Sequence, residues 1–285
     1  MTNNAVRTLI GGLALVLAAL TVPAAAARAE THECAPAKEH PNPVIVMPGG
    51  GIYSDSGADT AIEFLYGALR RTLREAGFCT VAFPHGIVAG IQGAGPIPDS
   101  ATAFAAFVDR VRAETGADRV DVVAHSEGAL VTNYYAKVLH GAPNLRRIVM
   151  FSPVTHGADP AQVATVIGAG TYPGGPEQLV TDFPVLVQAA GTVLTPFPAA
   201  MQCVAGSEVI EAVTRGGITQ PGIRYTVLAT RKDPFLTPAE TTSFIEEPGV
   251  LNAYYEDLFP AEAPTTHNTM PSSPSAMNWV QKQLT

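Results

Sequence analysis

Short runs of apolar residues alternate along the chain with longer segments in which apolar residues recur every three or four positions. The first run, 44–47, lies between Pro43 and the segment Pro48-Gly49-Gly50-Gly51, which predicts a buried strand followed by a loop. Thr60 and Glu63 then have the spacing of a capping box. The helix predicted from there has one apolar face and ends near Gly77; the face consists of Ile62, Leu65, Leu69 and Leu73.

The alternation continues to the end of the chain. In the predicted strands apolar residues mostly follow one another rather than occupy every second position, which is typical of strands buried on both faces. The sequence therefore predicts an α/β fold with a mostly parallel central sheet and helices on both faces, in a single domain over 30–285. Further strands are predicted at 80–83, 120–124, 147–151 and 225–230, and helices at about 104–116, 127–139 and 273–283.

One long segment departs from this pattern. Residues 155–201 are rich in Ala, Gly, Val, Thr and Pro, have no clear period and carry almost no charge. Long irregular segments inside a compact domain are usually functional or mobile. This one follows a predicted strand, so we expect an insertion that forms a cap or the wall of an apolar pocket.

The N-terminus has the features of a secretory signal peptide. Arg7 precedes an apolar run over 9–22, and Ala27-Arg28-Ala29 fits a cleavage site for small residues. A transmembrane anchor is the alternative, but the run is short for a membrane span. We therefore predict that residues 1–29 are removed and that the protein is secreted.

Charge and cysteine content narrow the class of protein further. The formal charge is −8, there is no basic cluster, and removal of the first 29 residues would change the charge to −10. So acidic a protein is not expected to bind nucleic acid or an anionic membrane surface. Three cysteines are too few and too scattered for a zinc site, and nothing indicates another metal. Cys34 and Cys79 flank the first two predicted strands and are the expected disulfide, which leaves Cys203 as a buried thiol.

The strongest chemical signal is the pentapeptide Ala124-His125-Ser126-Glu127-Gly128. It lies between a predicted strand and a predicted helix, which is the setting of a nucleophile elbow. Small residues on either side let the backbone turn sharply and present the hydroxyl above the sheet. Ser126 is the predicted nucleophile, although a pentapeptide of this kind also occurs by chance.

A serine hydroxyl needs an adjacent base and an orienting acid, and these follow the nucleophile in the order acid, then histidine. His267 is the one histidine that fits this order with room for an acid before it. Asp233 comes three residues after the predicted strand 225–230, where an acid is expected. Glu256 and Asp257 are competitors that lie further from a predicted strand end.

The tetrahedral oxyanion requires fixed backbone N–H donors. The amide of Glu127, directly after the nucleophile, is one expected donor. The glycines after the first strand allow close approach of backbone to substrate, and we favour Gly50 as the second donor, with Gly49 next.

These motifs together resemble the secreted bacterial class 2 lipases, from about Pro41 to the C-terminus. The resemblance is carried by the segments 43–51, 120–128, 225–233 and 266–268. It implies an α/β-hydrolase fold, carboxylic-ester substrates, no cofactor, and Ser126, Asp233 and His267 as the catalytic triad.

The chain departs from this family at three positions. Pro48 replaces the usual His of the oxyanion loop, and its fixed φ is expected to alter that loop. Glu127 replaces Gln, and an ionised carboxylate turned inward would oppose the oxyanion. Phe259 stands where relatives tend to carry Cys, which would leave Cys203 without a partner.

The sequence thus predicts a secreted serine carboxylic-ester hydrolase, a lipase or esterase, that acts on small-molecule or lipid esters and makes transient contact with lipid interfaces. No protein partner is evident. Two alternatives stay open: an acyltransferase with the same triad, and a non-catalytic lipid-binding protein on a hydrolase scaffold.

Overall fold

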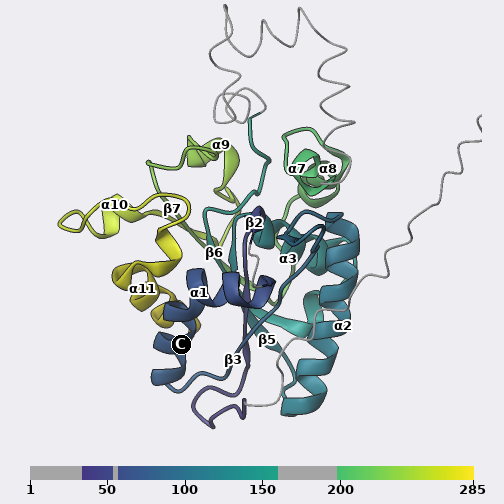
Figure 1. Cartoon of the computed structure of the whole chain (residues 1–285), viewed down its shortest axis with the longest axis vertical. Helices are drawn as coiled ribbons and strands as arrows, with labels where there is room; N and C mark the ends of the chain where they lie inside the picture. The colour runs from purple at the N-terminus through teal and green to yellow at the C-terminus, as the bar shows by residue number, and fades with distance from the viewer. Residues whose placement is uncertain (1–33, 54–56, 160–197) are drawn as a thin grey trace, which may run out of the picture.

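The computed structural model describes residues 34–53, 57–159 and 198–285. A parallel sheet runs through its centre, with helices on both sides (Figure 1). Its strands are β1 (Val44–Met47), β3 (Thr80–Ala82), β5 (Val120–His125), β6 (Leu145–Phe151), β7 (Arg224–Ala229) and β8 (Leu251–Tyr254). They are arranged in the order β3-β1-β5-β6-β7-β8, and all neighbouring pairs are parallel. The predicted α/β class is confirmed.

The continuously apolar strands serve two cores, one on each face of the sheet. In β1, Ile45 and Met47 pack into one core, while Val44 and Val46 pack into the other. Because alternate residues of a strand point to opposite faces, burial of both faces favours apolar residues at successive positions, and the buried exception Asp121 in β5 is paired with Arg146. This is the physical reason for the runs that predicted the sheet.

The helices divide between the two faces. Figure 1 shows α1 and α11 on one side of the sheet and α2 and α3 on the other, in agreement with the two cores. The longer helices are α1 (Ala58–Glu75), α2 (Ile97–Thr115), α3 (Glu127–Lys137), α8 (Glu208–Thr214) and α11 (Pro274–Leu284). Short helices are α7 (Pro198–Gln202), α9 (Ala239–Thr242) and α10 (Tyr255–Leu258), with 3-10 turns at Ala142–Asn144 and Met270–Ser272.

The start of α1 differs from its prediction. The helix begins at Ala58, after Gly57 with φ of 95°, and no side chain caps it. Thr60 therefore lies inside the helix, and the predicted capping box is wrong. Glu63 instead accepts a hydrogen bond from Arg70 Nη1 at 2.8 Å, about two turns further along the helix.

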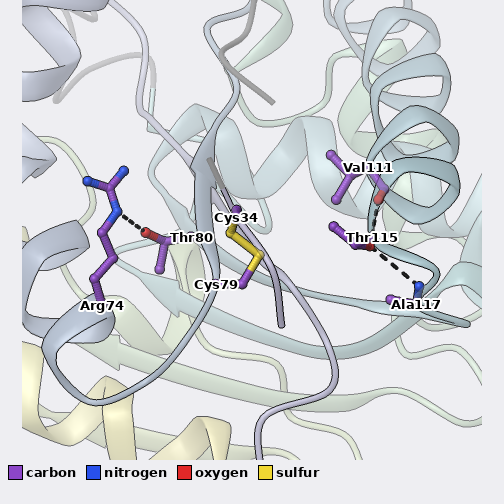
Figure 2. Close-up of a disulfide and its surroundings, with 7 residues drawn as sticks. All are labelled: Cys34, Arg74, Cys79, Thr80, Val111, Thr115 and Ala117. Carbon is purple, nitrogen blue, oxygen red and sulfur yellow. Dashed lines mark hydrogen bonds between the residues drawn. A yellow bond between two sulfur atoms is a disulfide. The ribbon is translucent and has the colours of Figure 1, made fainter. Parts of the chain in front are cut away.

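Cys34 and Cys79 form the predicted disulfide (Figure 2). Cys79 immediately precedes β3, and its carbonyl accepts a hydrogen bond from the amide of Val44 at 2.8 Å, so the bond lies at the N-terminal edge of the sheet. Cys203 is a free thiol, as expected, although it is half-buried rather than buried. It packs on the α2/α3 face, whereas Phe259 packs on the α1/α11 face, so a cysteine at 259 would be separated from Cys203 by the sheet. The expectation that Phe259 accounts for the unpaired Cys203 is therefore wrong.

Two predicted features lie largely outside the described residues: the signal peptide, 1–29, and most of the cap or pocket insertion, 155–201. Of that insertion the structure describes 155–159 and α7 only. In the described ranges, no helix combines the length and the apolar character that crossing a membrane requires.

Candidate active site

The predicted site residues gather at one edge of the sheet, beyond the carboxyl ends of its strands. Ser126 follows β5, Asp233 follows β7 by four residues, and the segment Pro48–Gly51 follows β1. Parallel strands end at the same edge, which is where open α/β sheets carry their ligand sites. His267 comes from the loop that precedes α11.

Ser126 occupies a strained backbone conformation between β5 and α3. Its φ of 53° and ψ of −124° are rare for a residue with a side chain. The turn is fixed on both sides, since the amide of Ser126 donates to the carbonyl of Phe151 and its carbonyl accepts from the amide of Ala129, both at 3.0 Å. A Cβ on Gly128 would lie 2.4 Å from the carbonyl oxygen of Pro48. Only glycine therefore fits at 128, and the strand-turn-helix geometry is that of a nucleophile elbow.

Asp233 and His267 form a buried pair. Asp233 Oδ2 lies 2.6 Å from His267 Nδ1, and both side chains are nearly inaccessible to solvent. The other carboxylate oxygen, Oδ1, accepts from the amides of Phe235 and Leu236 at 2.9 and 3.0 Å. Burial alone would raise the pKa of Asp233, but the hydrogen bond and charge of His267 outweigh it, so this pKa lies below its usual value. Asp233 is thus a fixed, ionised partner for one ring nitrogen.

The competing acids are engaged elsewhere. Glu256 accepts from the hydroxyl of Thr230 at 2.6 Å and from the amide of Arg231 at 3.2 Å. Asp257 makes two hydrogen bonds of 2.8 Å to the Arg231 guanidinium at the surface. Of the three candidate acids, the structure brings only Asp233 to His267.

His125 connects Ser126 to His267. The imidazoles of His125 and His267 lie with their centroids 4.7 Å apart, and His125 Nε2 is 3.0 Å from the carbonyl oxygen of His267. Ser126 directly follows His125, so the histidine loop packs against the elbow. Between these two described side chains, Ser126 and His267, the structure contains no direct hydrogen bond; in unliganded enzymes this contact is often long.

The loop after β1 packs against the elbow. A Cβ on Gly49 would lie 3.1 Å from the Cβ of Ser126, so the backbone of this loop reaches the serine side chain. The amide of Gly49 donates to the hydroxyl of Tyr66 at 3.0 Å and is therefore not available to a substrate. This leaves Gly50 as the candidate donor from the loop. The amide of Glu127 is in the first turn of α3, where N–H groups have no acceptor within the helix.

The side chain of Glu127 turns inward beneath this loop. A Cβ on Gly50 would lie 2.0 Å from Glu127 Oε2, and Glu127 Oε1 is 3.7 Å from His85 Nδ1. Burial raises the pKa of Glu127 well above its usual value, and burial also lowers the pKa of His85 to about 4. Both groups therefore favour their neutral forms. The carboxyl therefore turns inward, and burial favours its neutral form, which carries no charge to oppose an oxyanion.

Three further residues hold the loop, and sequence reasoning missed them. His85 Nε2 lies 3.0 Å from the carbonyl oxygen of Pro48, and the amide of Gly51 donates to the carbonyl of Gln92 at 2.8 Å. Tyr66 comes from the buried face of α1. In the sequence Tyr66 was one more apolar position of a helix, and the 84–96 loop had no period, so no signal pointed to this role.

Within the described part of the chain, no group of three or more His, Cys, Asp or Glu side chains is arranged to hold a metal ion. The groups that the described residues bring to this edge are a serine hydroxyl, a histidine–aspartate pair and backbone amides.

Comparison with solved structures identifies the fold. No model of a protein family matches the sequence, and no curated protein sequence matches it. Lipase B of Aspergillus fumigatus superposes with a TM-score of 0.64 and 17% identity, over 87% of this chain and 53% of that one. A mature lipase of Bacillus licheniformis gives 0.56 and 13%, over 88% of this chain and 94% of that one. A lipase-esterase related protein of Clostridium acetobutylicum gives 0.53 and 14%, over 88% and 97%.

The chain therefore has the α/β-hydrolase fold, and structures similar to it are lipases and esterases. It spans about half the length of the Aspergillus lipase and nearly the full length of the two bacterial proteins. At these identities the likeness establishes the fold, while the reaction has to be argued from the site.

Proposed function

We propose that the protein is a serine carboxylic-ester hydrolase of the lipase or esterase kind. The observation that carries this proposal is the buried Asp233–His267 pair, joined at 2.6 Å, beside the strained elbow that presents Ser126. A histidine held by a carboxylate on Nδ1 has Nε2 free to take a proton from a serine hydroxyl. Strained backbone at a nucleophile is typical of such sites.

In the proposed reaction, Ser126 Oγ attacks the ester carbonyl carbon while His267 Nε2 accepts the hydroxyl proton. The carbonyl electron pair moves to oxygen, and the amides of Gly50 and Glu127 donate to this oxyanion. When the tetrahedral intermediate collapses, the ester C–O bond breaks and His267 returns the proton to the leaving alcohol. Water then repeats the sequence on the acyl-enzyme and releases the carboxylic acid.

We further propose that the protein acts after export, because the Cys34–Cys79 disulfide is favoured by an oxidising compartment. The predicted signal peptide supports the same localisation. We also propose that the protein is related to the secreted bacterial class 2 lipases, a proposal that rests on the sequence motifs.

The test is hydrolysis of p-nitrophenyl esters from acetyl to palmitoyl by the mature protein and by its Ser126→Ala variant. We expect turnover that the variant loses by at least about 10³-fold, because the nucleophile is absent. The preferred chain length then separates esterase from lipase, and added alcohol separates hydrolysis from acyl transfer by the products formed. Equal rates in parent and variant, or no turnover of any ester, would overturn the proposal.

A further inference from the structure

A buried chain of hydrogen bonds crosses beneath the candidate active site. The amide of Gly49 donates to the hydroxyl of Tyr66 at 3.0 Å, that hydroxyl lies 2.7 Å from His125 Nδ1, and His125 Nε2 lies 3.0 Å from the carbonyl oxygen of His267. Tyr66 and His125 are 2% and 5% exposed. The chain therefore joins the glycine loop after β1 to the loop that carries His267 through two side chains shielded from water.

The direction of every bond in this chain follows from its two ends. The amide of Gly49 can only donate, so the Tyr66 oxygen accepts there and has its own proton free for His125 Nδ1. With Nδ1 accepting, the proton of a neutral His125 is on Nε2, which donates to the carbonyl of His267. Burial raises the pKa of Tyr66 and lowers the pKa of His125 well below its usual value, so both are neutral and can fill these roles.

Each end of the chain fixes a part of the reacting geometry. At one end, the bond to Tyr66 fixes the Gly49 amide, which directly precedes the peptide that carries the Gly50 amide. At the other end, the bond to the His267 carbonyl fixes the backbone of the residue whose imidazole is paired with Asp233. The elements involved are otherwise far apart in sequence, by 17, 59 and 142 residues along the three contacts.

We propose that Tyr66 and His125 are positioning residues that hold the Gly50 amide and the His267 imidazole in register across Ser126. They touch no reacting atom. The inference deepens the proposed ester hydrolysis and rests on it. The relative positions of an oxyanion donor and a base affect the rate only where both act on the same substrate. A misplacement of about 1 Å at such a site costs on the order of 10²-fold in rate.

The decisive comparison is Tyr66→Phe with Tyr255→Phe. Tyr255 is also 2% exposed and packs in the same core, and its hydroxyl makes a 2.9 Å hydrogen bond to Ser273 Oγ at the start of α11 rather than to Gly49 or His125. Both variants lose one buried hydroxyl and its hydrogen bonding. We expect kcat on a p-nitrophenyl ester to fall roughly 10- to 100-fold in Tyr66→Phe with KM nearly unchanged, and less than about threefold in Tyr255→Phe.

Two substitutions of His125 test separately its hydrogen bond to Tyr66 and its hydrogen bond to His267. In His125→Asn the side-chain oxygen takes the place of Nδ1 and keeps the bond to Tyr66, while the bond to His267 is lost. In His125→Gln the longer amide reaches the His267 carbonyl, while the acceptor for Tyr66 is lost. Both are expected to lower kcat, and Tyr66→Phe added to His125→Gln is expected to cost little more, because one link is already broken.

Nitrogen-15 NMR of the His125 ring tests the chain without using activity. We expect a neutral Nε2–H tautomer that does not titrate between pH 5 and 9, in the parent and in Ser126→Ala alike. A charged or Nδ1–H ring would overturn the inference, as would equal kcat in Tyr66→Phe and Tyr255→Phe. If no ester is turned over, the proposed function fails. The tautomer of His125 then still shows whether the hydrogen bonds from Gly49 to His267 form.

Discussion

Asp233 is held through both carboxylate oxygens, one by His267 and one by two backbone amides. Asp233→Asn keeps the shape of this contact but replaces the oxygen that accepts from Nδ1 with an amide, which favours the wrong tautomer of His267. We expect kcat for ester hydrolysis to fall by about 10³- to 10⁴-fold, as it does in serine protease triads.

The matched control is Asp257→Asn, the same substitution at the competing acid. Asp257 is exposed and pairs with Arg231 at the surface, so its loss is expected to change kcat by less than about threefold. Steady-state kinetics of the two variants on one p-nitrophenyl ester decide between the acids. An equal loss in both would remove Asp233 from the mechanism.

Glu127 gives a dependence of stability on pH with a defined sign. Its pKa is raised in the folded protein, so the folded state keeps a proton that the unfolded chain releases above about pH 4.5. Wild-type stability is therefore lowered by Glu127 as pH rises above this value. Glu127→Gln has no such proton, and its free energy of unfolding is expected to exceed that of wild type increasingly above pH 4.5, by up to about 1.4 kcal/mol per pH unit.

Because His85 faces Glu127, it must be included in the measurement. The folded pKa of His85 is about 4, below its unfolded value of about 6.5, so it lowers stability as pH falls below 6.5 in both proteins. The difference between variant and wild type cancels this contribution. Urea unfolding at pH 4, 6 and 8 is the measurement, and a difference that does not grow with pH would mean that Glu127 is ionised in the folded state.

The residues that the sequence could predict are those with fixed positions relative to strand ends. Ser126 directly follows a buried strand, Asp233 comes four residues after another, and His267 follows from their order along the chain. Tyr66, His85 and Gln92 could not be predicted in the same way, because their roles arise from contacts across the fold. A buried tyrosine on a helix face has the same pattern whether its hydroxyl bonds to a loop or to another helix.

At the level of elements, the close contact of α3 with the end of β1 depends on glycine. A Cβ at 128 would lie 2.4 Å from the carbonyl oxygen of Pro48 and 2.8 Å from that of Met47, both of them backbone atoms. Gly128→Ala must therefore move the helix, the strand or the loop between them. We expect a loss of about 2 to 4 kcal/mol in the free energy of unfolding, together with a loss of ester hydrolysis.

Gly67→Ala is the control for this substitution, since it places the same methyl group within another helix. There the new Cβ meets Glu63, a surface side chain that can move aside. Helix propensity then favours alanine by roughly 0.5 to 1 kcal/mol. Chemical denaturation of both variants checks the prediction, and similar stabilities would show that the α3–β1 contact can relax.

Elements were predictable from sequence where burial on two faces favoured a mostly apolar run, as in β1, β5, β6 and β7. The edge strand β8 was missed because only Tyr254 of its four residues is buried, so it has no such run. The paired two-residue strands β2 (Ile52–Tyr53) and β4 (Ile91–Gln92) are too short to have any period. Helix α1 was predicted from its apolar face, but its start was misplaced, because the structure begins it without a side-chain cap.

Across the whole molecule, the disulfide and the candidate site lie at opposite edges of the sheet. Cys79 precedes β3, at the N-terminal edge, whereas Ser126, Asp233 and the glycine loop follow their strands at the C-terminal edge. The bond closes a loop with a sequence separation of 45 residues, so in the chain-entropy model it stabilises the fold by about 4 kcal/mol. Stability and catalysis should therefore respond independently to its loss.

Replacing both Cys34 and Cys79 by serine is expected to lower Tm by roughly 10 °C, while kcat at 25 °C stays within about twofold of the parent. Cys203→Ala is the control, because it removes the free thiol and keeps the disulfide. A reductant should lower Tm of the parent and of Cys203→Ala, and leave the double serine variant unchanged. If the double variant lost kcat as well as Tm, the segment before β1 would be coupled to the site, and the two edges of the sheet would not be independent.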